Sequence, residues 1–495
     1  MTKLCNSSLS VSGRIFAVIT CAIMTGFMWR VRGDHGWDSM WGMFAVGVML
    51  ILFIYAVFGD RKKMNYEMLP VAVLLLGITN GGWGTLNSQM EGYLTSTAPF
   101  TGEEAARLAE IDPVHGLYMM LFLGFGWMPL FAFIVASLFS KKEYKIRHYV
   151  ILVAVFYVVT YVFKFSLSHF ILEAIHPEAV ALCKEGFLDR GIDLSPMMAY
   201  IKEFGSAAWA KKIPFARNYF TSIDVMSAAF GALFTSLTAL VIFKDKFTAL
   251  ISFLINSVCS LSITVADVFL IIGSDRGILP PVEVPRWIEA PAWSLWEFFT
   301  GFLLGAGLML ILVCIPKKYI EEEPFDTIGF IKNRKLHYVY TAFINVTYML
   351  VLTLMRPLGM RIGSRLFDNG IVSDEDTVGT IVAVVLTVIG GIIAAVLCKN
   401  VLKEEKLPFG TTPAVFCRKA VPAYFLATSV VYFLSDDELP FEGIKSAEAF
   451  TEKFMNGGLT VLLLTLIAFI LFCIFCFLTF RSLEKHRKID VKSFT

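Results

Sequence analysis

The sequence predicts an all-α integral membrane protein with about twelve transmembrane helices, arranged as six hairpins that point outward. Three observations lead to this class. The 495-residue chain is 56% hydrophobic and only 17% charged, far from the composition of a soluble domain. Apolar runs of about 18 or more residues, the length needed to cross roughly 30 Å of hydrocarbon, recur about twelve times. Basic residues gather in alternate loops between these runs.

Each apolar run is predicted to be a helix, because only a helix satisfies its own backbone hydrogen bonds in lipid. No alternating pattern typical of a membrane strand is found. The predicted spans lie near residues 13–31, 41–59, 67–86, 115–139, 148–172, 220–243, 248–273, 293–315, 337–359, 377–398, 414–434 and 457–480.

The basic residues predict the orientation, since Lys and Arg of short loops stay on the cytoplasmic side. Alternate loops read DRKK at 60–63, SKKEYKIR at 140–147, KDK at 244–246, KNVLKEEK at 399–406 and RSLEKHRK at 481–488. Both termini are therefore predicted to be cytoplasmic, in a multi-pass protein of the cell membrane. The first apolar run is followed by WRVR instead of a small-residue cleavage site, so we expect it to be the first span.

The chain is predicted to form a single polytopic domain over residues 1–495. GWDSMWGMF and AWSLWEFF open two corresponding helices, which suggests duplicated halves, 1–246 and 247–495, although aromatic belts are common in membranes. Residues 173–219 form the largest predicted extracytoplasmic loop. EAVALCKEGFLDRG, SPMMAYIKEFGSAAWAKK and, in another outer loop, TGEEAARLAEID read as short amphipathic helices at the surface. GFLLG at 301–305 has the small-residue spacing that lets helices pack closely.

Ionisable and polar groups gather at the outer ends of the predicted spans. Charged groups at membrane depth are costly unless they are paired or hydrated, so these positions are the main functional signal. If the outer ends converge, they line a polar cavity that binds substrate; the alternative is a set of side chains at the lipid headgroup boundary. The substrate-binding candidates are Arg30, Arg32, Asp34, His35, Trp83, Asn87, Gln89, Lys164, Asp267, Glu297 and Arg356.

Two smaller patterns allow more than one interpretation. Spacings of four and three place His169, Glu173 and His176 on one helical face, which is a weak metal-site pattern and more often a surface cluster. Arg32-Gly33-Asp34 reads as a glycine turn that brings its flanking charges together. In an enzyme, His35 or Asp34 is the candidate general base.

Motifs of soluble catalytic machinery are absent from the sequence. It contains no Walker A pattern, no G-x-G-x-x-G followed by a helix, no G-x-S-x-G and no H-E-x-x-H, so we predict no cofactor and no resident metal. The basic residues follow the topology pattern, which gives no indication of nucleic-acid binding.

Three functions are consistent with these features. Twelve spans with both ends inside are typical of secondary transporters, so we favour transport of a polar solute, anionic or sugar-like, coupled through Asp267, Glu297 or Asp34. The apolar inner half argues against this, because alternating access needs a polar route to the cytoplasm. The alternative is a membrane-embedded transferase or hydrolase that acts at the outer face on a lipid-linked or cell-envelope substrate. A scaffold or sensor without turnover is the third. The lipid bilayer is the expected partner in each case, and the sequence assigns no oligomeric state.

Overall fold

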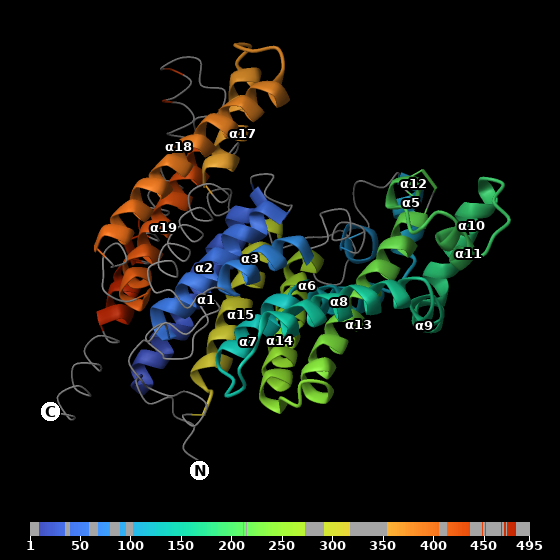
Figure 1. The fold of residues 1–495 in the computed structure, drawn as a ribbon. Helices are drawn as coiled ribbons and strands as arrows, with labels where there is room; N and C mark the ends of the chain where they lie inside the picture. Colours follow the sequence, from blue (N-terminus) through green and yellow to red (C-terminus); the bar gives the residue numbers. More distant parts are fainter. Residues whose placement is uncertain are drawn as a thin grey trace. The chain divides into compact units, whose positions relative to one another are not determined.

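The structure is a computed structural model in which all regular secondary structure of the described residues is helical (Figure 1). It describes residues 9–34, 40–58, 68–79, 90–95, 102–210, 212–213, 215–272, 292–316, 354–404, 413–435, 448, 451, 467, 470–471 and 473–481. The chain forms two compact units. Unit 1 comprises Met1–Gly77, Val284–Ala290 and Gly301–Thr495, and unit 2 comprises Ile78–Glu283 and Pro291–Thr300. These units do not divide the chain at residue 246, and the internal repeat stays a prediction.

Unit 1 contains long apolar helices that pack side by side. Its helices are α1 (Val11–Asp34), α2 (Met40–Phe58), most of α3 (Met68–Thr79), most of α15 (Ala292–Val313), α17 (Arg356–Asp368), α18 (Glu375–Glu404) and α19 (Pro413–Ser435). Helix α1 packs against α2 and α19, α2 packs against α19, and α17 lies along α18. Helix α1 continues through Gly33 to Asp34. The predicted glycine turn is therefore wrong, because the arginines before it lie on the last turns of a regular helix.

The GFLLG segment makes the close helix contact that its spacing predicts. A Cβ atom on Gly305 would lie 2.6 Å from the carbonyl oxygen of Cys21, and one on Gly301 would collide with the carbonyl oxygen of Thr25. Both glycines therefore face the backbone of α1, which side chains would push away.

Unit 2 is built around α13 (Ala216–Val241), which contacts most of the other helices of the unit. Its partners are α6 (Val114–Trp127), α7 (Pro129–Leu138), α8 (Ile146–Lys164), α9 (Leu167–Ile175), α10 (Pro177–Asp189), α11 (Pro196–Lys202), α12 (Ala207–Ala210) and α14 (Lys246–Ile272). The π-helical turn η1 (Met90–Thr95) packs on α5 (Gly102–Ala109), α6 and α14.

The short helices predicted in the outer loops are present as α5, α10, α11 and α12. Helices α9–α12, residues 167–210, gather at the end of α13 where that helix begins, and we refer to them as the cap (Figure 1). Their apolar faces are buried against α13, since Cys183, Phe187 and Tyr200 share one core cluster with Tyr219 and Phe220. The helices predicted to lie at the surface in residues 178–210 therefore pack together as a small layer with its own buried core.

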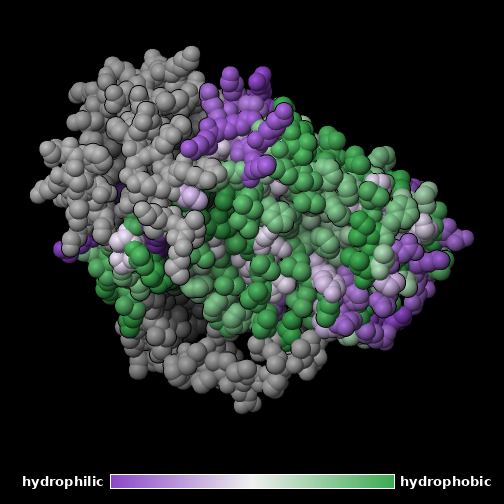
Figure 2. Space-filling model, turned by 90° about the horizontal axis from the view of Figure 1, so that it is seen from below, coloured by the Kyte–Doolittle hydropathy of each residue, from purple (hydrophilic) through white to green (hydrophobic). Residues whose placement is uncertain are grey.

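Five described helices are long and apolar enough to cross a membrane, and α6 and α7 together form a sixth if the bent pair is one span. In Figure 2 hydrophobic side chains make up most of the visible described surface. On α8, Val150, Val158 and Val162 are more than half exposed, as expected of a face that contacts lipid. A multi-pass membrane protein is the class that these helices support.

Two predicted spans are interrupted in the structure. The run 115–139 bends by 48° between α6 and α7, where Pro129 has no amide hydrogen for the carbonyl of Phe125 and its ring cannot continue the helix. The run 148–172 ends its first helix at Lys164, because Ser166 leaves helical geometry (φ −146°, ψ −101°) before α9 begins. Most of the predicted spans 337–359 and 457–480 lie outside the described residues.

The basic loops at 140–147 and 244–246 lie together at one end of unit 2. Asp245 accepts hydrogen bonds from Ser140 Oγ at 2.5 Å, Tyr144 Oη at 2.8 Å and Thr248 Oγ1 at 2.7 Å, and Lys142 Nζ donates to the carbonyl of Phe243. Both loops therefore lie at the same end of the helices of unit 2, and their side of the membrane stays a prediction.

Candidate functional site

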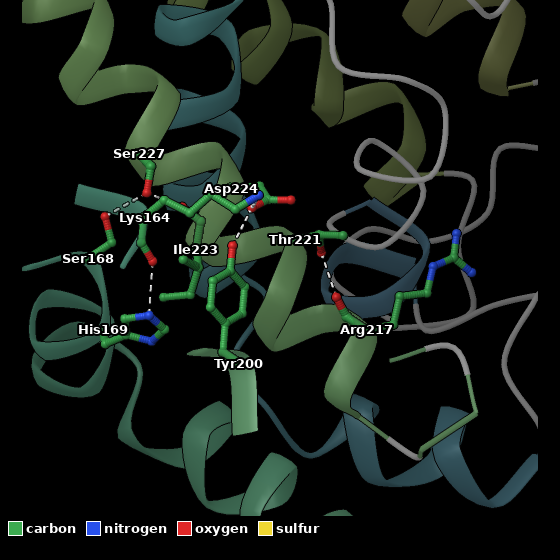
Figure 3. A network of polar contacts seen from close by, with 9 residues as sticks. All are labelled: Lys164, Ser168, His169, Tyr200, Arg217, Thr221, Ile223, Asp224 and Ser227. Atoms are coloured by element: carbon green, nitrogen blue, oxygen red, sulfur yellow. Dashed lines mark hydrogen bonds and ion pairs between the residues drawn. The ribbon is translucent and has the colours of Figure 1, made fainter. Parts of the chain in front are cut away.

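An ion pair joins the end of α8 to α13. Lys164 Nζ lies 2.7 Å from Asp224 Oδ1, and the hydroxyl of Tyr200 on α11 donates to the same oxygen at 2.7 Å (Figure 3). The ammonium group also lies 5.7 Å from the centroid of the Tyr200 ring. The Lys164 and Asp224 side chains keep 19% and 30% of their surface exposed. The pair is therefore largely desolvated, yet part of it can be reached from outside.

His169 holds the backbone of Lys164 in place. Its Nε2 lies 3.0 Å from the carbonyl oxygen of Lys164, and its Nδ1 lies 2.6 Å from the hydroxyl of Tyr219. A carbonyl oxygen can only accept, so Nε2 carries the hydrogen that the Lys164 carbonyl accepts, and in the neutral ring Nδ1 accepts from the hydroxyl of Tyr219.

Two further contacts make the site rigid. Ser168 Oγ and Ser227 Oγ lie 2.9 Å apart, and Ser227 donates to the carbonyl of Ile223 at 2.6 Å (Figure 3). Gly205 has φ +66°, and a Cβ atom there would lie 2.6 Å from Tyr200 Oη and 2.9 Å from Lys164 Cε. The segment after α11 therefore closes over the ion pair, and only glycine fits this position without strain.

A second buried carboxylate lies on α14. Asp267 is fully buried, and its Oδ1 accepts the indole N–H of Trp296 at 2.8 Å. Its Oδ2 has no hydrogen-bond partner among the residues that the structure describes. Glu297, next to Trp296 on α15, is also buried. A carboxyl oxygen left open in an apolar interior is an unusual arrangement, and such groups are commonly retained for function.

Both carboxylates lie at the same end of unit 2. Helices α13 and α14 are joined at Lys244 and Asp245 and pack against each other. Asp224 and Asp267 are nearly equal numbers of residues from that turn, so they lie at similar heights along the hairpin. The basic loops at 140–147 and 244–246 lie at the opposite end of the hairpin.

The other predicted substrate-binding residues are placed as follows. Arg32 is buried on α1 of unit 1, with its guanidinium 5.3 Å from the ring centroid of Trp29, and Arg30 is half-buried on the same helix. Asp34 is the last residue of α1 and Arg356 the first of α17. His35, Trp83, Asn87 and Gln89 lie outside the described residues. That all of these groups line one common cavity stays a prediction.

The weak metal pattern does not form a site. Both ring nitrogens of His169 are taken by protein partners, and Glu173 points to the surface. His176 lies at the break between α9 and α10, where its ring meets that of His115 with centroids 4.0 Å apart. In the described part of the chain no group of three or more His, Cys, Asp or Glu side chains is placed to hold a metal ion. The helix break removes the common face that the spacing assumed.

The sequence interpretation did not select Tyr200, Tyr219 and Asp224. The two tyrosines lie in or beside a long outer loop that gives no register relative to Lys164. Asp224 offered a signal, because it is a lone carboxylate near the start of an apolar run, as Asp267 is near the end of one.

The site is thus a partly accessible Lys–Asp pair between a membrane helix and the cap, with a second buried carboxylate at the same height of the same unit. No family model, curated protein or solved structure matches this chain.

Proposed function

We propose that this chain is a secondary transporter for a small polar solute, and that the solute is an anion that binds at Lys164. The proposal includes the finer topology of twelve spans in six outward-pointing hairpins, with both termini in the cytoplasm and residues 173–219 outside the cell membrane. The observation that carries it is the Lys164–Asp224 pair, which is largely desolvated but still accessible. Ionisable groups at such depth commonly belong to a substrate or proton pathway.

The chemistry of the pair suggests how a proton and an anion are coupled. While Asp224 is ionised, it occupies the ammonium group of Lys164. A proton taken up by Asp224 removes that competition, and Lys164 becomes free to bind a carboxylate or phosphate group of the solute. The hydroxyl of Tyr200 can hydrogen-bond either the carboxyl group of Asp224 or the bound anion. Release of the proton from Asp224 restores the ion pair and displaces the anion from Lys164. Proton and anion are therefore bound and released together, which is symport.

The cap and the broken helix supply the parts that alternating access needs. The cap covers the pair through Gly205 and Tyr200, and the 48° break between α6 and α7 is a discontinuity typical of transporter helices. Asp267, one of whose oxygens has no partner in the described part of the chain, is the second candidate proton carrier.

The test is uptake into proteoliposomes under an inward proton gradient, with radiolabelled succinate, phosphate and glucose as probes. We expect succinate or phosphate to accumulate above protein-free liposomes. Lys164→Met should abolish both accumulation and equilibrium exchange, because the anion site is lost. Asp224→Asn should keep exchange but lose proton-driven accumulation, because its side chain no longer titrates. Arg107→Gln removes the exposed pair with Glu185 and is the matched control, for which we expect normal uptake.

Accumulation of glucose alone would contradict an anion site, and uptake of none of the three probes would count against transport. Protein-dependent conversion of membrane lipids, followed by thin-layer chromatography, would then favour the membrane-embedded transferase or hydrolase.

A further inference from the structure

A row of polar side chains runs along the buried face of α14. Thr248, Ser252, Asn256, Ser260 and Asp267 are at most 6% exposed, and the first three and the last are fully buried. Steps of mostly four residues turn the row only slowly around the helix, so that it stays within an arc of about 120°. Leu250, Leu254, Leu261 and Val265 form the exposed apolar face of the same helix.

The row is long enough to cross the membrane. From Thr248 to Asp267 the helix rises by about 28 Å, close to the roughly 30 Å of a hydrocarbon core. At the N-terminal end of α14, Thr248 donates to Asp245 at 2.7 Å, in the loop between α13 and α14. At the other end of the row lies Asp267, whose Oδ2 has no hydrogen-bond partner among the described residues. The row therefore joins the two ends of unit 2, through the half that the sequence suggested to be apolar.

Neighbouring helices also present polar atoms to this row. Ser252 Oγ lies 3.2 Å from Ser236 Oγ of α13, and Ser260 Oγ donates to the carbonyl of Leu121 on α6 at 2.6 Å. Gly124 lets α6 approach so closely that a Cβ atom would lie 2.5 Å from the Cα of Ser260. Pro129 cannot donate to the carbonyl of Phe125, which lies on the same helix as Leu121 and Gly124.

Asn256, at the middle of the row, has a donor and an acceptor that nothing in the described structure satisfies. It is fully buried, and neither Nδ2 nor Oδ1 has a hydrogen-bond partner among the described residues. An unpaired buried amide is strongly unfavourable compared with a leucine of similar size. Water is the usual partner of such a group in a polar surrounding. The amide therefore indicates a bound water molecule or a passing polar species at this depth.

We propose that the polar face of α14 is a water-accessible proton path between Asp267 and the loop that contains Asp245, with Asn256 binding water at its midpoint. The path conducts by passing a proton from one water or hydroxyl group to the next, so no bond of the chain is broken. This path would carry the proton that drives uptake through the apolar half of unit 2. Only this coupling role rests on the proposed transport function.

The direct test is the reaction of single cysteines with a small charged methanethiosulfonate reagent, which needs water at the thiol. The nine native cysteines are first replaced by serine or alanine, and folding is checked by size-exclusion chromatography. We expect Ser252→Cys, Asn256→Cys and Ser260→Cys to react from solution. Leu254→Cys and Leu261→Cys, on the exposed apolar face at the same depth, should stay unreactive, as should Ile255→Cys, which is equally buried but adjacent to the row.

Reaction at residue 256 no faster than at residue 255 would overturn the path. This assay uses no solute, so its result is separate from that of the uptake test. Labelling of the row without uptake would leave the path standing and reject the transport function, whereas uptake without labelling would reject the path.

The Asn256→Leu variant distinguishes a role of Asn256 in proton conduction from a purely structural role. The substitution removes two unsatisfied polar atoms, so the melting temperature should be equal or higher. We nevertheless expect proton-driven uptake to fall at least about tenfold while solute exchange continues, because the chain of polar groups is interrupted. Unchanged proton-driven uptake in Asn256→Leu would contradict the role of the amide. Asn256→Ser, which replaces the amide with a hydroxyl that can also hydrogen-bond water, should retain most of the activity.

Discussion

Lys164 Nζ and Asp224 Oδ1, 2.7 Å apart, join the last residue of α8 to the third turn of α13. The contact fixes the position of the C-terminal end of α8 along α13. It also gives Tyr200 of the cap a charged oxygen to donate to. One pair thus links a membrane helix, the central helix of unit 2 and the cap.

Removal of either partner should destabilise unit 2. We expect Lys164→Met and Asp224→Asn each to lower the free energy of unfolding by about 1–3 kcal/mol, between the values typical of exposed and of fully buried pairs. The measurement is unfolding of the purified protein in detergent. The double variant should cost less than the two single changes added together. Strict additivity would show that the pair contributes no coupling energy.

Gly205→Ala should destabilise the cap more than Gly191→Ala. Both glycines have positive φ, +66° and +71°, but an alanine Cβ at 205 would meet Tyr200 and Lys164, whereas no atom of the described residues lies within 4 Å at 191. Backbone strain alone costs about 1–2 kcal/mol at each position, and overpacking adds about 1–3 kcal/mol at residue 205 only.

The measurement for this pair is the difference in melting temperature between the two variants, with proteolysis of the cap as a second readout. Equal losses for both variants would mean that the cap does not close tightly over the ion pair.

Gly305→Val should weaken the contact between α15 and α1 in unit 1. The new side chain would meet the carbonyl of Cys21, and the expected cost is about 1–3 kcal/mol. Gly391→Val in α18 is the matched control, because no described atom would lie within 4 Å of its Cβ and valine disfavours a helix equally there. If thermal unfolding in detergent gives the same loss for both, the close approach of α15 and α1 is not a source of stability.

Acid should weaken the loop network around Asp245. Burial opposes ionisation of this carboxyl, but the hydrogen bonds from Ser140, Thr248 and Tyr144 outweigh it and lower its pKa below the ordinary value of 3.8. A lowered pKa in the folded state adds stability that is present above the unfolded value and is lost as the pH falls through the folded one. We therefore expect wild-type stability to decline below about pH 4.

Asp245→Asn isolates this contribution. The variant should lose about 1–3 kcal/mol at neutral pH, where the carboxylate accepts its bonds, and its difference from wild type should shrink as the pH falls. Denaturant unfolding in detergent between neutral pH and the acid limit provides the comparison. A difference that is constant with pH would show that the charge of Asp245 has no role.

Hydrophobic length and glycine spacing were reliable guides to local structure. The apolar runs that lie among the described residues are helical, the amphipathic segments 101–112 and 178–191 predicted α5 and α10, and GFLLG predicted the contact of α15 with α1. These features depend on neighbours in sequence or on the lipid environment, and both can be assessed from the chain alone. Interruptions such as Ser166 were missed, because an apolar run continues through a local change of backbone angles.

The sequence by itself determined the class of the protein, since the length and apolar character of its runs leave helices as the means of satisfying the backbone in lipid. Only the tertiary structure decided which polar groups meet. Lys164 contacts Asp224 because α8 packs against α13, and His169 hydrogen-bonds Tyr219. Asn256 is buried in the polar row that runs along α14. The reason is physical: the hydrophobic effect and backbone hydrogen bonding act on every residue in turn, whereas the pairing of charges depends on which helix faces lie against each other.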